Sequence, residues 1–335
     1  MNSEVTKIKP NKDRKMSINR DYFWFRLFKT RGIGPKLLVS IAEILEADNL
    51  NPEILPRSQS ELSAQFPKLA KILNGKIRAE DREKVSKEYE ELKRQGVNII
   101  YPGHPDLQPH ILEISPILFV KGRQKRLMSD SVAIVGARNV SDIGIRIAKK
   151  LAGDLADEGL NIVSGYAKGV DSEAHLGALE AEGTTTLVLP HGIKQLHQKS
   201  AFKKFNWDQD VLAVSQFDPN SRWRARNAMV RNKLVCGLSK AVVVIESGPE
   251  RNEQGKMSGT FSAAKTALSM DLPLFVLNPN CLDDAPKGNA ELIKLGGYSL
   301  DPVNGAKEIV ERIFVKKAKP ASIANQNSTE QLSLF

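Results

Sequence analysis

The chain has 335 residues and a formal net charge of +10, which is long enough for two domains, one of them with a full-sized core. It contains no run of 18 apolar residues and no hydrophobic signal core at its N-terminus, so we expect a cytoplasmic protein without a membrane span. Its two cysteines, Cys236 and Cys281, cannot form a metal knuckle and are expected to be free thiols in a reducing compartment.

Positive charge is concentrated toward the N-terminus. Residues 1–130 hold 24 Lys and Arg against 17 Asp and Glu, and the first 36 residues hold ten against three. An excess of positive charge favours a polyanionic partner, and nucleic acid is the first candidate. Lys and Arg can also simply keep the surface soluble. Residues 1–20 are polar and Lys-rich, and we expect them to form a basic mobile arm.

Residues 21–95 predict a small helical N-terminal domain. Apolar residues recur at helical spacing on both sides of the turn at residues 30–35, which reads Thr-Arg-Gly-Ile-Gly-Pro. This is the pattern of a helix-hairpin-helix, in which Gly32 and Gly34 would let the backbone approach a DNA phosphate. An ordinary corner between two helices needs glycine for the same steric reason, so both interpretations stay open.

Residues 96–315 predict an α/β domain. After a charged helical segment at 76–96, strands are expected at 97–101, 117–120, 132–136, 160–164, 185–189, 211–215, 241–245 and 273–277. Helices are expected at 142–157, 170–182, 225–238 and 260–270, with one or two helical pieces in 289–314. Strands that alternate with helices indicate a parallel sheet covered on both faces.

Two of these strands end in turns that carry a glycine and a cation. Val-Ala-Ile-Val-Gly-Ala-Arg ends at Arg138, and Ile-Val-Ser-Gly-Tyr-Ala-Lys-Gly begins at Ile162 and includes Lys168. Because neighbouring parallel strands end at the same edge, both cations should face one groove and contact phosphates, unless they pair with Asp171 or Glu173. Ser164, Gly165 and Gly169 would let backbone N–H groups approach an anion. The first turn lacks the Gly-x-Gly-x-x-Gly pattern of a dinucleotide site.

Residues 222–233 read Arg-Trp-Arg-Ala-Arg-Asn-Ala-Met-Val-Arg-Asn-Lys, with five cations and no acid. Basic groups beside an aromatic ring suit a single-stranded nucleic acid, since charge follows the backbone and the ring stacks on a base. A solvated helix face with a packed Trp is the alternative. The candidate contacts from this segment are Trp223, Arg224, Arg226, Arg231, Asn232 and Lys233.

Neither a metal site nor a catalytic residue is expected. Asp171 and His175 are four residues apart on one helix, but a carboxylate at a helix start is more often a cap or a partner of the helix dipole. His191 and His197 lack further ligands at suitable spacing. We therefore predict no metal and no cofactor.

The motifs together resemble the DprA/Smf family of DNA-processing proteins. Those that carry the resemblance are Val-Ala-Ile-Val-Gly-Ala-Arg, Ile-Val-Ser-Gly-Tyr-Ala-Lys-Gly-Val-Asp-Ser-Glu-Ala-His, Val-Arg-Asn-Lys-Leu-Val-Cys-Gly-Leu-Ser and Val-Val-Val-Ile-Glu-Ser. The resemblance covers about residues 22–300. It implies an extended Rossmann-like domain that binds single-stranded DNA, forms a homodimer and assists loading of the RecA recombinase, usually in transformation. By the resemblance, Arg231 and Asn232 line the DNA pocket.

The sequence departs from the family pattern at several places. Residues 301–335 are too short for the winged helix that many members carry, and residues 248–257 separate Ser258-Gly259-Thr260 from the preceding strand. The Ser-Gly-Thr segment is also similar to a motif of related nucleotide-cleaving enzymes of the lysine-decarboxylase-like group. Their catalytic Glu would fall at Ala263, so we predict a protein without enzymatic activity and keep a nucleotide-binding or nucleotide-cleaving enzyme or sensor as the alternative.

The chain ends in a short motif after a polar linker. Residues 316–335 are rich in Lys, Ser, Asn and Gln and predict a disordered tail. The last five residues resemble the peptide by which bacterial replication and repair proteins dock on the sliding clamp. In such a peptide Leu332, Leu334 and Phe335 would supply the apolar contacts and Gln331 a polar one. A frayed tail that happens to end in apolar residues is the alternative.

We predict that deletion of residues 331–335 abolishes binding to the bacterial sliding clamp and leaves affinity for an oligonucleotide unchanged, because the two contacts lie on separate segments. A pull-down with purified clamp, run beside an oligonucleotide titration, measures both. Retention of the clamp by the truncated protein would show that the tail is not the anchor.

Overall fold

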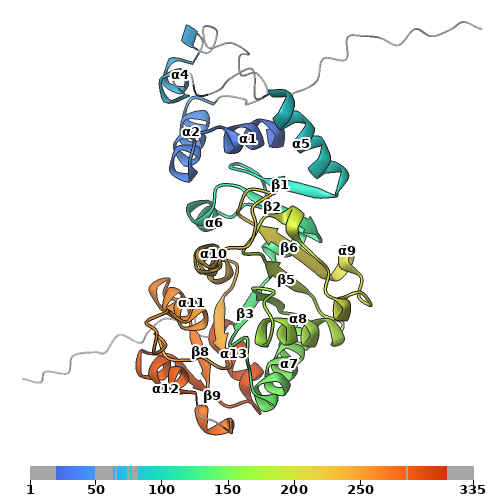
Figure 1. The fold of residues 1–335 in the computed structure, drawn as a ribbon, viewed down its shortest axis with the longest axis vertical. Coiled ribbons are helices and arrows are strands. Elements are labelled where there is room, and N and C mark those ends of the chain that lie inside the picture. Colours follow the sequence, from blue (N-terminus) through green and yellow to red (C-terminus); the bar gives the residue numbers. More distant parts are fainter. Residues whose placement is uncertain are drawn as a thin grey trace, which may run out of the picture.

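The computed structural model of the chain describes residues 20–49, 63–64, 66–73, 76, 82–283 and 286–314. The predicted arm at 1–20, apart from Arg20, and the predicted tail at 316–335 with its terminal motif lie outside these residues. In the part that is described, no helix is both long and apolar enough to span a bilayer. Figure 1 shows a helical N-terminal part packed on one end of a larger α/β part.

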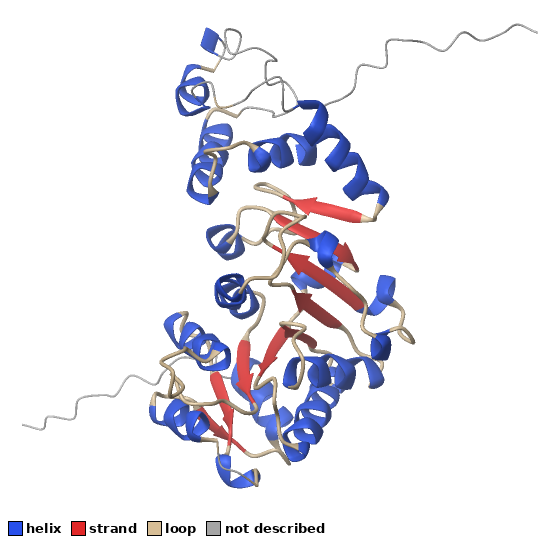
Figure 2. Ribbon diagram, viewed as in Figure 1, coloured by secondary structure: helices blue, strands red, loops and turns tan. Residues whose placement is uncertain are grey.

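One sheet organises the α/β part, and it confirms the predicted fold class (Figure 2). Within the described residues its strands are β1 (Val97–Ile100), β2 (Leu118–Gly122), β3 (Ser131–Val135), β4 (Asn161–Ser164), β5 (Thr185–Val188), β6 (Val211–Ser215), β7 (Ala241–Val244), β8 (Leu274–Leu277) and β9 (Tyr298–Leu300). The strand order is β1-β2-β6-β5-β4-β3-β7-β8-β9. The pairs β1–β2 and β2–β6 are antiparallel and the others are parallel.

Strand β3 is the point where the winding of the sheet reverses. It pairs with β4 on one side and with β7 on the other, so the strands that follow β3 in the chain lie on both sides of it. The order β5-β4-β3-β7-β8-β9 is that of a Rossmann fold, and β6, β2 and β1 extend it. In open sheets of this kind, ligands bind at the carboxyl ends of the strands where the order reverses.

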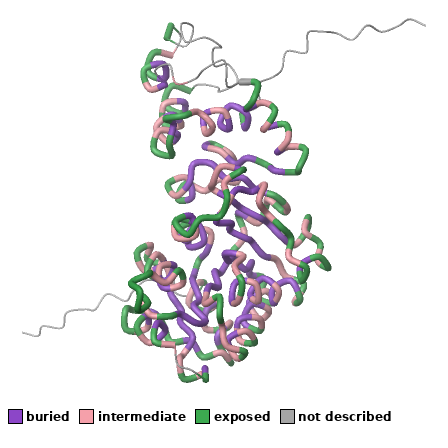
Figure 3. The backbone as a smooth tube through the Cα atoms, viewed as in Figure 1, coloured by how far each residue is buried: buried purple, intermediate pink, exposed green. Residues whose placement is uncertain are grey.

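Helices cover both faces of the sheet, because successive side chains along β3 belong to two different apolar clusters. Figure 3 shows that the backbone of the central strands is buried between these layers. In β3, Val132 and Ile134 face α7 (Asp142–Asp157), α8 (Val170–Glu180) and α13 (Gly305–Phe314). Ala133 and Val135 face the opposite layer. The helices of that layer are α6 (Pro109–Ile114), α10 (Ala225–Gly237), α11 (Gly259–Ser269) and α12 (Lys287–Lys294).

The helical part shares a core with the sheet. Its helices are α1 (Arg20–Lys29), α2 (Pro35–Ala47), α4 (Pro67–Leu73) and α5 (Arg82–Arg94). Phe25 and Phe28 of α1 pack against Phe119 of β2, with ring centroids 6.0 and 5.2 Å apart. Lys29 also forms an ion pair of 2.5 Å with Asp218 of the α/β part. The predicted boundary at residues 95 and 96 falls between α5 and β1, but one continuous apolar cluster crosses it.

The C-terminal region contains a strand that the sequence prediction lacked. Residues 289–314 were expected to be helical pieces only, yet β9 lies between α12 and α13. Three residues are too few to show an alternating pattern, and the hydrogen bonds of β9 come from pairing with β8. The short helices α6 and α9 (Trp207–Asp210) were likewise not predicted.

We predict that Phe119→Ala lowers the free energy of unfolding by about 3–5 kcal/mol, because it empties a fully buried ring position between the two parts. Phe314→Ala, at a ring that is 44% exposed, should lower it by about 1 kcal/mol or less. Denaturant titration of both variants measures the difference. Equal losses would contradict a shared core at Phe119.

Candidate functional site

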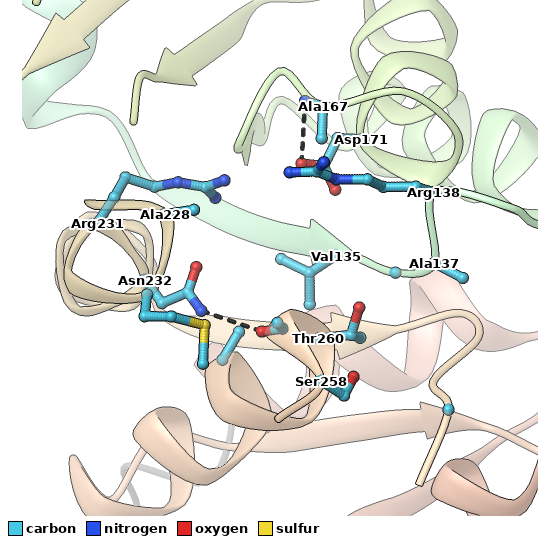
Figure 4. Close-up of a pocket in the computed structure, with 15 residues that line it drawn as sticks. Val135, Ala137, Arg138, Ala167, Asp171, Ala228, Arg231, Asn232, Ser258 and Thr260 are labelled. Carbon is cyan, nitrogen blue, oxygen red and sulfur yellow. Dashed lines mark hydrogen bonds between the residues drawn. The ribbon is translucent and has the colours of Figure 1, made fainter. Parts of the chain in front are cut away.

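A pocket of about 240 Å³ lies at the carboxyl ends of β3 and β7, where the strand order reverses (Figure 4). Five segments line it: the turn after β3, the turn after β4 with the start of α8, helix α10, the loop after β7 at Gly248, and the N-terminus of α11. Three charged side chains are among its lining residues, namely Arg138, Asp171 and Arg231. The fold therefore brings two cations and one carboxylate into a single concave site.

Arg231 places a buried positive charge in the pocket wall. Its side chain comes from α10, is 6% exposed, and lies so close to Gly165 that a Cβ there would collide with the guanidinium. Its Nε has no hydrogen-bond partner among the residues that the structure describes. Burial lowers the pKa of Arg231, while nearby Asp171 opposes this shift and nearby Arg138 adds to it. A buried cation with an unused donor is stabilised by an anionic ligand.

Arg138 and Trp223 lie together beside this buried charge. The Cζ atom of Arg138 is 5.7 Å from the centroid of the Trp223 ring, within the range of a cation–π contact. The Trp223 side chain is 50% exposed, which is unusual for a large aromatic residue in a packed protein. The next cations along the chain, Arg224 and Arg226, are exposed as well. An accessible ring among accessible cations is the arrangement predicted from the sequence of this segment.

Asp171 is the acidic side chain of the pocket lining, and it caps its own turn. Its Oδ2 accepts a hydrogen bond of 3.2 Å from the backbone N of Ala167 (Figure 4). No ion pair joins Arg138 or Lys168 to Asp171 or Glu173 in the described part of the chain. The ion pairs with Asp171 or Glu173, which were the alternative to phosphate contacts for these two cations, are therefore absent from the described residues.

Asn232 connects two walls of the pocket. Its Nδ2 donates to the backbone O of Gly259 at 3.0 Å, which links α10 to the start of α11 (Figure 4). Ser258, Gly259 and Thr260 line the pocket even though residues 245–257 separate Ser258 from the end of β7. This happens because the intervening loop folds back on itself through a bridge between Arg251 and Met257.

Some of the predicted site residues lie elsewhere. Ser164 is fully buried and its hydroxyl donates to the backbone O of Ile134 at 2.6 Å, so its side chain supports the sheet. Lys168 and Lys233 are exposed but are not among the lining residues. Gly32 and Gly34 are exposed in the turn between α1 and α2, outside this pocket.

Gly169 is the N-cap residue of α8 and has a φ of 81°, a left-handed conformation that favours glycine. A Cβ at this position would collide with the backbone oxygens of Ala137 and Arg138. The turn after β4 therefore packs directly on the turn after β3. This contact joins the two strand ends that the sequence predicted to be neighbours.

Asp171 and His175 share a helix but do not form a metal pair. His175 is fully buried away from the pocket lining, and its Nδ1 contacts Thr185 Oγ1 at 2.6 Å. Burial holds the pKa of His175 well below its ordinary value. No group of three or more His, Cys, Asp or Glu within the described ranges could hold a metal ion.

Glu246 is a residue at the switch point that the sequence reasoning missed. Its carboxylate accepts hydrogen bonds from the backbone N of Ser141 at 3.1 and 3.3 Å and from the Ser141 hydroxyl. Gly144 leaves room for this approach, since a Cβ there would collide with Glu246. In a dinucleotide-binding sheet, this helix N-terminus receives the pyrophosphate. The signal in the sequence was a carboxylate two residues after β7, the strand that pairs with β3 at the reversal.

A family model described as DNA recombination-mediator protein A matches residues 95–313. The chain belongs to this family. It is similar to protein Smf of Synechocystis sp., with 28% identity over 273 residues that cover 80% of this chain and 67% of the relative. Protein Smf of Escherichia coli is 31% identical over 198 residues, which cover 58% of this chain and 50% of the relative. These matches confirm the resemblance drawn from the motifs.

Solved structures of the family share the fold. DNA processing protein A of Streptococcus pneumoniae superposes with a TM-score of 0.68 and 23% identity, covering 87% of this chain and 97% of that one. The Helicobacter pylori protein, described for its single-stranded DNA binding mode, gives a TM-score of 0.51 at 26% identity. That match covers 64% of this chain and 96% of the Helicobacter chain.

We predict that Gly165→Ala lowers the free energy of unfolding by about 1–3 kcal/mol, because the added methyl group must displace the Arg231 guanidinium. Gly259→Ala is the matched control, since it also lines the pocket but no atom lies within 4 Å of the added Cβ. It should be neutral or slightly stabilising at a helix start. Denaturant midpoints compare them, and equal effects would contradict close packing of Arg231 on Gly165.

Proposed function

We propose that the protein binds single-stranded DNA in the pocket at the switch point and acts as a recombination mediator. The observation that carries this proposal is the buried Arg231, whose Nε lacks a partner, beside the accessible Arg138 and Trp223. A single-stranded polyanion with exposed bases would supply a partner for each of these groups. Its phosphate oxygens would contact the cations, and its bases would stack on the indole ring. Membership of the family supports the same ligand, as does the single-stranded DNA binding described for the Helicobacter pylori protein.

Each predicted contact has a physical role in this proposal. Arg138, Lys168, Arg224, Arg226 and Lys233 are exposed and would neutralise phosphates along the strand. Trp223 would stack on a base, and Arg231 would meet the phosphate that enters the pocket. The buried Ser164, the close-packed Gly165 and Gly169, and the bridging Asn232 would hold the walls in place.

A nucleotide-binding or nucleotide-cleaving enzyme is the second candidate, because the strand order and the pocket position are those of a nucleotide fold. Two features disfavour it. Glu246 occupies the helix N-terminus that a nucleotide phosphate would need, and Ala263 stands in the pocket lining where the related enzymes would have their Glu. We therefore propose a protein without enzymatic activity. If the pure protein releases more than one equivalent of base from a nucleoside monophosphate or NAD, the proposal that it lacks enzymatic activity is wrong.

The partners inferred from the resemblance complete the proposal. The protein would act in the cytoplasm as a homodimer, assist loading of the RecA recombinase, and be held near replication forks by clamp binding through residues 331–335. The turn at Gly32 and Gly34 would add a phosphate contact from the helical part.

We predict that Arg138→Ala weakens binding to a fluorescent single-stranded oligonucleotide and flattens its salt dependence by about 0.7 log–log units, the value for one lost phosphate contact. Arg146→Ala removes the same charge from an exposed position on α7 and should leave the slope nearly unchanged. Anisotropy titrations at several salt concentrations measure both. Identical slopes for the two variants would remove Arg138 from the DNA contact.

Replacement of Trp223 by Ala should cost about 1–3 kcal/mol of binding free energy if the ring stacks on one base. With Trp24 and Trp207 changed to Phe, the fluorescence of Trp223 should also respond to saturating oligonucleotide. A silent fluorescence signal together with unchanged affinity would show that the ring does not contact DNA.

A further inference from the structure

The turn after β4 has a backbone conformation that its sequence does not favour. Tyr166 has a φ of 57°, in the left-handed region that residues with a side chain rarely adopt. Such a conformation persists only where surrounding contacts hold it. The turn of residues 165–169 therefore needs an external support.

Lys199 supports this turn through three hydrogen bonds from its ammonium group. Its Nζ donates to the backbone O of Tyr166 at 3.0 Å, to the backbone O of Ala167 at 3.1 Å and to Ser172 Oγ at 2.7 Å. An ammonium group has three donors, so each of them has a partner here. The two carbonyl groups that it joins belong to the strained residue and to the residue after it.

Lys199 also holds the Tyr166 side chain. Its Nζ lies 4.2 Å from the centroid of the Tyr166 ring, and its backbone N donates to the Tyr166 hydroxyl at 2.9 Å. The fully buried Phe202 packs edge-on against the same ring, with centroids 5.3 Å apart. Burial lowers the pKa of Lys199, while Asp171 and Glu173 favour its charged form. Hydrogen bonds in such a partly desolvated place are stronger than in water.

The supported turn forms part of the candidate site, whereas Lys199 does not line the pocket. Within the turn, Gly165 packs under the Arg231 guanidinium, Ala167 lines the pocket and Gly169 packs on the backbone of Arg138. Lys168 extends from the same turn into solvent. A change in the backbone at Tyr166 would shift these groups together.

We propose that Lys199 is a positioning residue for DNA binding, which fixes the conformation of the turn of residues 165–169. It thereby sets the direction of the Lys168 side chain and the position of Gly165, on which the Arg231 guanidinium packs. The inference rests on the proposed function, because the turn matters for binding only if the strand crosses it. Lys199 comes from the connection between β5 and β6, which the sequence does not link to the site.

The test compares Lys199→Met with Lys203→Met. Both remove one positive charge from the same segment, but Lys203 is exposed and has no hydrogen bond to the turn. Lys199→Met should lower affinity for a single-stranded oligonucleotide about tenfold, as expected when hydrogen bonds to a charged group are lost. Lys203→Met should lower it less than about twofold at roughly 0.15 M salt. Equal losses would reduce Lys199 to a surface charge and overturn the proposal.

A double-mutant cycle separates positioning from general destabilisation. The loss caused by Lys168→Ala should shrink by at least about twofold in the Lys199→Met background, because the turn is already displaced. Additive losses would overturn the proposal. Ser172→Ala, which removes one of the three acceptors with little risk to folding, should show the same coupling more weakly.

Hydrogen exchange of the DNA-free protein gives a readout that does not depend on the proposed function. Lys199→Met should accelerate exchange at the amides of residues 166–170 and leave the rest of the sheet unchanged, whereas Lys203→Met should change neither. Faster exchange in the variant, with a wild-type protein that does not bind DNA, would reject the proposed function alone. Unchanged exchange in the turn, with DNA binding intact in the wild type, would reject the role of Lys199 alone.

Discussion

Parallel pairing of β3 with β4 on one side and β7 on the other is the constraint on which the rest of the site depends. It sets the turn that carries Arg138 against the turn that carries Gly165, and it leaves a space at the edge of the sheet that α10 and α11 close. Because Val135 and Ala133 face α10 and α11 while Ile134 faces α7 and α8, the same strand anchors both layers. The pocket therefore lies where a strand buried on both faces ends.

The electrostatics of this edge differ from those of a nucleotide-binding fold. Two helix N-termini that point toward the switch point carry carboxylates of the protein itself: Glu246 at α7 and Asp171 in the first turn of α8. These carboxylates satisfy the helix dipoles internally. In the proposed function the cations Arg138 and Arg231 would meet an anion from outside, and Arg231 would do so from a buried position where screening by salt is weak.

The helical part contacts the loop that leads to Trp223. Lys29 at the end of α1 forms ion pairs with Glu88 of α5 and with Asp218, which lies five residues before Trp223. Asn220 of the same loop donates to Glu88 at 2.7 Å. The loop that carries Trp223 and the exposed arginines is thus bonded at its start to the helical part, which also packs on the sheet at Phe119.

The sequence by itself determined the fold class, most strand positions and the family, because these depend on local patterns. Short β-branched runs predicted the strands, and the glycine and cation after two of them led to the prediction of an anion site at Arg138. Only the tertiary structure decided which residues share the pocket. It buried Ser164, placed Lys168 outside the lining, and brought Glu246 and Lys199 to their turns from segments more than 30 residues away. Such contacts depend on the order of the strands and on packing between segments that are distant in the sequence. They cannot be predicted from the spacing of neighbouring residues.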